Sequence, residues 1–204
     1  MAYEFIIFDV ETNGLMPAFN SVLSFSGLHV STFRNGDYRR FEVKEEFDRY
    51  YYSIEPYNPE AVRVNGLTAD VIKQKRGPGD NRYPSYFNQD KEVILFCGKA
   101  DLAVCHNSPF DTGFLLTAHN YEFKRNFCTM RNFTGTCAIA HKYYGVKWPK
   151  LEEAVDIICD RKDFDFHDSL SDCYAVLELL RTMANSREGS MENVWPDKFD
   201  EIFR

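Results

Sequence analysis

The sequence has 204 residues, of which 44% are hydrophobic and 27% are charged. This length supports one well-packed domain, and no stretch approaches the eighteen or so consecutive apolar residues that a membrane-spanning helix needs. The N-terminus has no basic region ahead of its short apolar run, so we expect no signal peptide. A soluble protein with no membrane partner is the expectation.

Six cysteines occur without a CxxC pair, and several lie inside apolar runs such as LAVCHN. We therefore expect buried, reduced thiols in a cytoplasmic protein, rather than a zinc cluster or a disulfide framework. The net charge of −7 is concentrated in residues 151–204, which hold 14 acidic and 6 basic side chains. The overall acidity disfavours tight duplex binding but does not exclude an anionic substrate.

Strands are expected first, and strands alternating with helices follow. Apolar and alternating stretches predict four extended segments in the first part of the chain, at 3–8, 22–30, 38–43 and 51–55. Helical patterns follow at 59–65, 68–75, 86–97, 109–120, 132–144, 150–159 and 169–184. Two short strands, at 101–105 and 126–129, lie among these helices. This order predicts a mixed α/β sheet with helices packed on it.

No linker long enough to separate two domains interrupts the pattern. We expect one domain over residues 1–184 and a C-terminal tail over 185–204, with a short helix that begins at Pro196. The apolar residues of the tail have near-helical spacing, and they either dock on the domain or bind a partner such as a polymerase. These residues are Trp195, Phe199, Ile202 and Phe203.

Two acidic residues occur at the end of the first predicted strand, in the stretch FDVETNGL. Side chains in a strand alternate between faces, so Asp9 and Glu11 point the same way. Adjacent carboxylates repel each other and are costly to desolvate unless a cation lies between them. Taken alone, the pair is more typical of a solvated strand end.

Two further stretches, HNSPFD and HDSLSD, place acids at the start of predicted helices. Asp111 falls in a first helical turn, where a carboxylate also complements the helix dipole. Asp172 lies at the edge of the apolar stripe of its helix, and Asp168 is the better candidate for the N-cap. We expect His106 to form local hydrogen bonds rather than act as a base. Each pattern alone is weak support for a site.

Together and in this order, the three stretches resemble the DEDDh exonuclease family, which includes the proofreading subunits of bacterial replicative polymerases. FDVETNGL is similar to the first motif, HNSPFD to the second and HDSLSD to the third. NPEAVRVNGLT and PKLEEAVDIIC also resemble segments of the family, so the likeness covers residues 3–184. It implies a ribonuclease H-like α/β fold, with a mixed five-stranded sheet flanked by helices.

The resemblance implies that Asp9, Glu11, Asp111 and Asp172 hold two divalent ions, Mg²⁺ or Mn²⁺, and that His167 is the general base. Four carboxylates are a reasonable ligand set for these hard cations. Two such ions can activate water, orient a phosphate and stabilise a leaving oxygen. An imidazole suits proton abstraction near neutral pH.

The resemblance also implies contacts to the end of the substrate. The backbone at Thr12 would approach the terminal nucleotide, Leu15 would pack near its base, and Asn107 matches a motif position whose role stays open. Many relatives have a second threonine where this chain has Asn13. That difference leaves the four carboxylates intact but puts details of end binding in doubt.

The implied activity is stepwise 3′→5′ hydrolysis that releases nucleoside 5′-monophosphates. Single-stranded or frayed DNA ends are the first expectation, in proofreading or repair, with a DNA polymerase subunit as a further partner. The alternatives are trimming of RNA ends, because the family processes both, and an accessory or scaffold subunit of a polymerase complex. Basic candidates for contacts to the substrate's phosphates are Arg63, Lys73, Lys75, Arg76, Lys124, Arg125 and Arg131.

Overall fold

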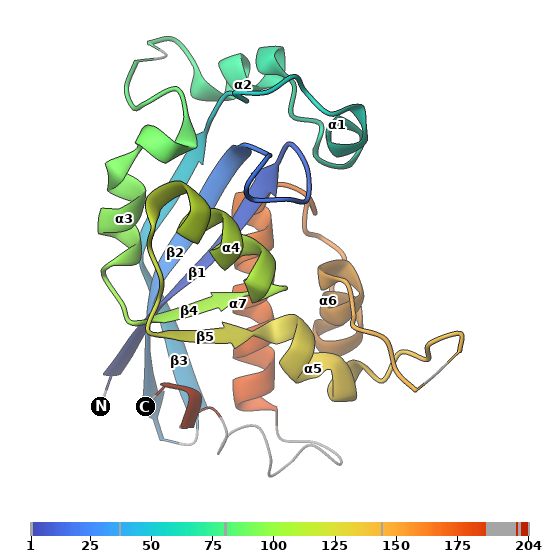
Figure 1. The fold of residues 1–204 in the computed structure, drawn as a ribbon. Coiled ribbons are helices and arrows are strands. Elements are labelled where there is room, and N and C mark those ends of the chain that lie inside the picture. Colours follow the sequence, from blue (N-terminus) through green and yellow to red (C-terminus); the bar gives the residue numbers. More distant parts are fainter. Residues whose placement is uncertain are drawn as a thin grey trace.

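The computed structural model of the chain describes residues 2–36, 38–79, 81–143, 145–186, 199 and 201–203 (Figure 1). Five strands form one sheet in the order β3-β2-β1-β4-β5. Their bounds are β1 Ala2–Thr12, β2 Val22–Asn35, β3 Tyr38–Tyr50, β4 Leu102–Cys105 and β5 Arg125–Cys128. β2 pairs antiparallel with both β1 and β3, whereas β4 and β5 run parallel to β1. The predicted mixed five-stranded sheet is confirmed.

Within the described residues, α-helices cover both faces of the sheet. Their bounds are α1 Pro59–Asn65, α2 Ala69–Arg76, α3 Lys91–Cys97, α4 Ser108–His119, α5 Thr129–Cys137, α6 Leu151–Cys159 and α7 Ser169–Asn185. None of these helices has the length and apolar character needed to cross a bilayer. The side chains of Asn58, Thr68 and Asp168 accept backbone N–H groups at the starts of α1, α2 and α7, which explains where these helices begin.

The side chains of β1 alternate between two hydrophobic clusters, one on each face of the sheet. Phe5 and Ile7 pack with α6 and α7, and the even-numbered residues of 6–10 pack with α3 and α4 on the other face. The same alternation places Asp9 and Glu11 on the α7 face, beyond the last apolar side chain there. The first strand therefore carries its carboxylates directly to the start of α7.

The predicted strand at 51–55 is wrong, because β3 ends at Tyr50. The guanidinium of Arg76 is buried and donates to the backbone oxygens of Tyr50 and Tyr83, at 2.7 and 2.9 Å. These bonds tie α2 and the following loop to the end of β3, where the chain leaves the sheet. They also show that Arg76 has a structural role, so its assignment as a phosphate contact is wrong.

The predicted helix at 86–97 is divided in two. Phe87–Gln89 forms a single 3₁₀ turn, and α3 starts only after Asp90. The carboxylate of Asp90 accepts the backbone N–H of Glu92 at 3.1 Å, so a new helix begins at this cap.

The predicted helix at 132–144 is also wrong in extent, because α5 spans Thr129–Cys137. Ala138 has a left-handed backbone with φ 47°, which ends the helix. Residues 139–143 and 145–148 then form an antiparallel hairpin closed by the Ala140–Val146 bridge. Its turn includes Gly145 at φ 50°, a conformation that glycine adopts without steric cost.

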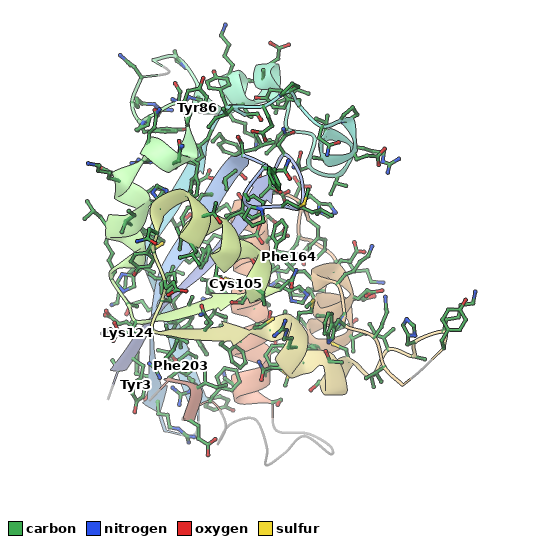
Figure 2. All side chains as sticks on the ribbon, viewed as in Figure 1. Tyr3, Tyr86, Cys105, Lys124, Phe164 and Phe203 are labelled. Carbon is green, nitrogen blue, oxygen red and sulfur yellow. The ribbon has the colours of Figure 1, made fainter. Side chains whose placement is uncertain are left out.

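The described part of the C-terminal tail lies on the domain. The predicted helix start at Pro196 and the preceding tryptophan lie outside the described residues, but Phe199 and residues 201–203 are helical. Phe199 and Phe203 are buried in the α7-side core, and the rings of Phe203 and Phe5 lie 4.9 Å apart between centroids. Figure 2 shows Phe203 close to Tyr3, near the start of β1. These aromatic residues complete the core there.

Candidate active site

Three carboxylates converge where β1 meets the start of α7. Asp9 and Glu11 lie on β1, and Asp172 lies in the first turn of α7. One carboxylate oxygen from each residue lies within 4.8 Å of the other two. Three like charges at this distance repel each other strongly in a partly buried site.

Asp111 approaches the same point from α4. β4 pairs with β1 only at Ile6 and Ile7, so beyond these residues no strand within the described part of the chain pairs with β1 on this side. Asp111 Oδ1 accepts the free N–H of Val10 at 3.3 Å. Val10 lies between the two acidic residues of β1, so this bond brings the fourth carboxylate against the other three.

Burial and neighbouring charges raise the pKa values of all four carboxylates. Burial, followed by the charges of Asp111, Asp172 and Glu11, raises the pKa of Asp9 well above its ordinary value. Burial and the charge of Asp172 raise the pKa of Glu11 to about 8, and burial raises the pKa of Asp172 to about 7. Burial also raises the pKa of Asp111 well above its ordinary value. The group therefore binds protons at neutral pH unless a cation replaces them.

Two carboxylate oxygens of this group are in the state expected of ligands to a cation. Asp111 Oδ2 and Asp172 Oδ1 are buried, and neither has a hydrogen-bond partner among the described residues. Buried polar atoms in folded proteins are nearly always partnered, so the two orphaned oxygens need an explanation. Oxygen atoms from four carboxylates suit hard divalent cations such as Mg²⁺ or Mn²⁺. The donor set therefore fits a divalent metal centre.

His167 lies at the mouth of this centre, immediately before α7. Its side chain is exposed and its backbone is left-handed, with φ 71°. The backbone N–H of His167 donates to Asp172 Oδ2 at 3.2 Å. Asp168 next to it is the N-cap of α7, as the sequence predicts. The cap and this hydrogen bond hold the histidine beside the carboxylates.

A buried group of serines seats the start of α7 on the sheet. The hydroxyl of Ser169 lies 2.9 Å from that of Ser24 and 2.7 Å from that of Ser26. Ser24 and Ser26 are the β2 partners of Glu11 and Asp9. These short side chains let the helix approach the strand pair closely, so they determine the spacing between Asp172 and the acids of β1.

A cavity of about 440 Å³ opens beside Glu11 and His167, walled on the far side by α1 and α2. Asn65 lines it and was missed by sequence reasoning. Its amide donates to the backbone oxygen of Thr12 at 3.0 Å, and a hydrogen bond from Asn65 lowers the pKa of Glu11 against the larger effect of burial. The only sequence signal for this role is its place in NPEAVRVNGLT.

The three predicted substrate-binding residues differ in environment. Thr12 is buried, its hydroxyl donates to the Gly14 oxygen at 2.6 Å, and its backbone oxygen accepts the Asn65 amide. Leu15, three residues after Thr12, is 82% exposed. Asn107 has a left-handed backbone at the start of α4, four residues before Asp111.

His106 is occupied away from the carboxylates. Its Nδ1 lies 3.0 Å from the Thr129 hydroxyl, and its Nε2 donates to the Pro149 oxygen at 3.0 Å. Burial lowers the pKa of His106 to about 4. His106 thus forms hydrogen bonds, as expected, but its partners are 23 and 43 residues away in the sequence and not local. These contacts fix the turn that leads to α4.

The fold and the carboxylate centre define the class of this protein, and the family comparison agrees. A family model described as Exonuclease (RNase_T) matches residues 6–180. The chain therefore belongs to this exonuclease family, in its DEDDh group, and the resemblance found in the sequence is confirmed.

The relatives include two bacterial replication proteins. The chain is 26% identical to DNA polymerase III subunit epsilon of Pasteurella multocida over 161 residues, which cover 74% of this chain and 57% of that protein. It is 33% identical to DNA polymerase III PolC-type of Halalkalibacterium halodurans over 114 residues, 56% of this chain and 7% of that protein. The matched region thus spans about half the length of the epsilon subunit and a small part of the length of the PolC-type polymerase.

Two solved structures share the fold. Escherichia coli Exonuclease I in complex with a dT13 oligonucleotide has a TM-score of 0.67 at 16% identity, covering 98% of this chain and 43% of that one. Exonuclease X in complex with 5′ overhanging duplex DNA has a TM-score of 0.57 at 18% identity, covering 92% and 96%.

The raised carboxylate pKa values predict how a metal stabilises the protein at different pH. In the metal-free folded state Glu11 and Asp172 hold protons that the unfolded chain releases, so stability falls as the pH rises from about 4 to about 8. A divalent cation binds the ionised carboxylates, so its stabilising effect grows over the same range.

We therefore expect the gain in melting temperature from Mn²⁺ to be larger at about pH 8.5 than at about pH 5.5. Thermal unfolding with and without the ion measures it. An Asp9→Asn, Glu11→Gln double variant is the control and should lose the gain. An equal gain at both pH values, or a gain that survives in the double variant, would contradict this account.

Proposed function

We propose that this chain is a metal-dependent 3′→5′ exonuclease that releases nucleoside 5′-monophosphates from single-stranded or frayed DNA ends. One observation carries the proposal: four carboxylates from β1, α4 and α7 converge, and two of their buried oxygens have no partner among the residues that the structure describes. Family membership supports a nuclease, and the direction of digestion and the product rest on the proposed roles below.

Asp9, Glu11, Asp111 and Asp172 would hold two Mg²⁺ or Mn²⁺ ions. Bound there, the ions would supply Lewis-acid stabilisation of charge on the phosphate and the leaving oxygen. Their positive charge also offsets the acidic site, which would otherwise repel a phosphodiester. His167 would accept the proton of the attacking water, because it is exposed at the mouth of the same site.

A free 3′ end would be bound by the loop that follows β1. The backbone at Thr12 would approach the terminal nucleotide, Leu15 would pack against its base, and Asn107 would contact the substrate from the start of α4. The high exposure of Leu15 supports this role, because a base ring would cover the leucine. A site that encloses the last nucleotide excludes an internal phosphate.

DNA is the proposed substrate, and proofreading or repair the proposed role. The neighbours of known structure were solved with single-stranded and overhanging duplex DNA, and two relatives are DNA polymerase III proteins. A DNA polymerase is accordingly the proposed protein partner. RNA trimming is the second candidate, because a single contact to the 2′-hydroxyl decides between the sugars.

Digestion of matched DNA and RNA oligonucleotides, labelled at the 5′ end, tests the proposal. With Mg²⁺ or Mn²⁺ the DNA should give a ladder that shortens by single nucleotides, and a 3′-phosphate should slow it by adding charge where the hydroxyl lies. Faster digestion of RNA than of DNA would indicate that RNA ends are the substrate. No digestion of either, by a folded protein that binds metal, would favour an accessory subunit.

A further inference from the structure

The base of the hairpin formed by residues 139–143 and 145–148 lies at the same end of the sheet as the carboxylate centre. β1, β4 and β5 are parallel, and the hairpin follows α5, which starts directly after β5. Figure 1 shows this gold hairpin extending beyond α5 and α6 at the right of the molecule. The His106 bond to the Pro149 oxygen ties its base to the turn between β4 and α4, the helix that carries Asp111.

Two aromatic side chains of the hairpin are unusually exposed. Tyr143 is 76% exposed and Trp148 is 61% exposed. Each has a cation over its ring: Lys142 lies 5.1 Å from the Tyr143 centroid, and Arg131 of α5 lies 5.7 Å from the Trp148 ring. Large rings in water with neighbouring cations are the elements from which single-strand binding surfaces are built.

The charges on this surface favour an anionic occupant. Residues 138–150 include three lysines and no acidic residue, within a chain of net charge −7. Lys147 and Lys150 pair with Glu153 and Glu152 at the start of α6. In the part of the chain that the structure describes, neither Arg131 nor Lys142 forms an ion pair, so both are available to phosphates.

We propose that this hairpin, with Arg131, binds single-stranded nucleic acid on the 5′ side of the nucleotide held at the carboxylate centre. Unpaired bases stack on Trp148 and Tyr143, and the phosphates between them contact Arg131 and Lys142. The inference rests on the proposed nuclease function for the direction of the strand. An acidic peptide would satisfy the charges but would leave the two rings unstacked.

Binding is measured in EDTA, so that cleavage does not enter and failure of the proposed nuclease activity is scored separately. The chain has two tryptophans, and a Trp195→Phe variant leaves Trp148 as the sole indole. Oligothymidylate of about 15 nucleotides should quench its fluorescence, because stacked bases quench an indole. The dissociation constant comes from the anisotropy of the same oligonucleotide with a fluorescent label.

Trp148→Ser should raise the dissociation constant at least about five-fold, a typical loss for one stacked base. Arg131→Ser and Lys142→Ser should each lower the slope of log affinity against log salt by about 0.7. Tyr38→Ser and Lys44→Ser, on β3, are the matched controls and should match the parent. The proposal would be overturned by absence of quenching, or by affinities within about two-fold of the parent in all three hairpin variants. That result is expected if the hairpin instead binds another protein.

Discussion

Replacing Asp9 by Asn, Glu11 by Gln, Asp111 by Asn or Asp172 by Asn is expected to remove nearly all nuclease activity. Mutation of a group that hydrogen-bonds to a metal ligand typically lowers metal affinity or activity about 10–100-fold. Loss of a ligand itself should therefore lower the rate by more than about 100-fold. Each substitution keeps the shape of the side chain and removes its charge. Initial rates on a 5′-labelled oligonucleotide with saturating Mn²⁺ measure the effect.

The same four variants are expected to be folded and, without metal, at least as stable as the parent. Burial raises the pKa values of all four carboxylates, and charges within the group add to this effect for Asp9, Glu11 and Asp111, so removing one charge relieves its neighbours. Thermal unfolding in EDTA provides this control, with Asp70→Asn on the surface of α2 as the matched neutral change. Near-parental rates in any two of the four variants would contradict a shared metal centre.

His167→Ala is expected to lower the rate by about 10²–10⁴, a typical contribution of a general base. Metal binding should persist, because the carboxylates are unchanged. The parent should also lose rate at acid pH, because a protonated imidazole cannot accept a proton. With Mn²⁺ saturating at each pH, so that protonated carboxylates do not limit metal binding, that acidic limb of the pH–rate profile should be absent from the variant.

His29→Gln is the matched control, because His29 lies on β2 and pairs with Glu4. It should keep both the rate and the acidic limb. Added imidazole should restore part of the activity of His167→Ala, since the exposed position leaves room for the small base. If His167→Ala keeps its rate and its acidic limb, His167 is not the base.

Much of the site could be predicted because its residues follow local rules. Alternation along β1 places Asp9 and Glu11 on one face, and the capping preference of Asp168 leaves Asp172 free to face them. Both inferences need only the period of one strand or the start of one helix. The three motifs together predict the family for the same reason.

The contacts that join distant segments could not be predicted. Asp111 reaches Val10 because β4 ends before β1 does, and Asn65 contacts Thr12 because α1 folds back over the site. Arg76 is read as a surface cation from its sequence, yet it is buried at the end of β3. Such positions depend on tertiary packing, which a local pattern does not contain.

The most direct test of the central claim compares a linear single-stranded DNA with a covalently closed circle of the same sequence. Both are incubated in one tube with the protein and Mg²⁺ or Mn²⁺, and a parallel tube contains EDTA. The account predicts that the linear strand shortens from its 3′ end, that the circle stays intact, and that EDTA stops the reaction. Efficient cutting of the circle, or digestion that continues in EDTA, would contradict a metal-dependent exonuclease.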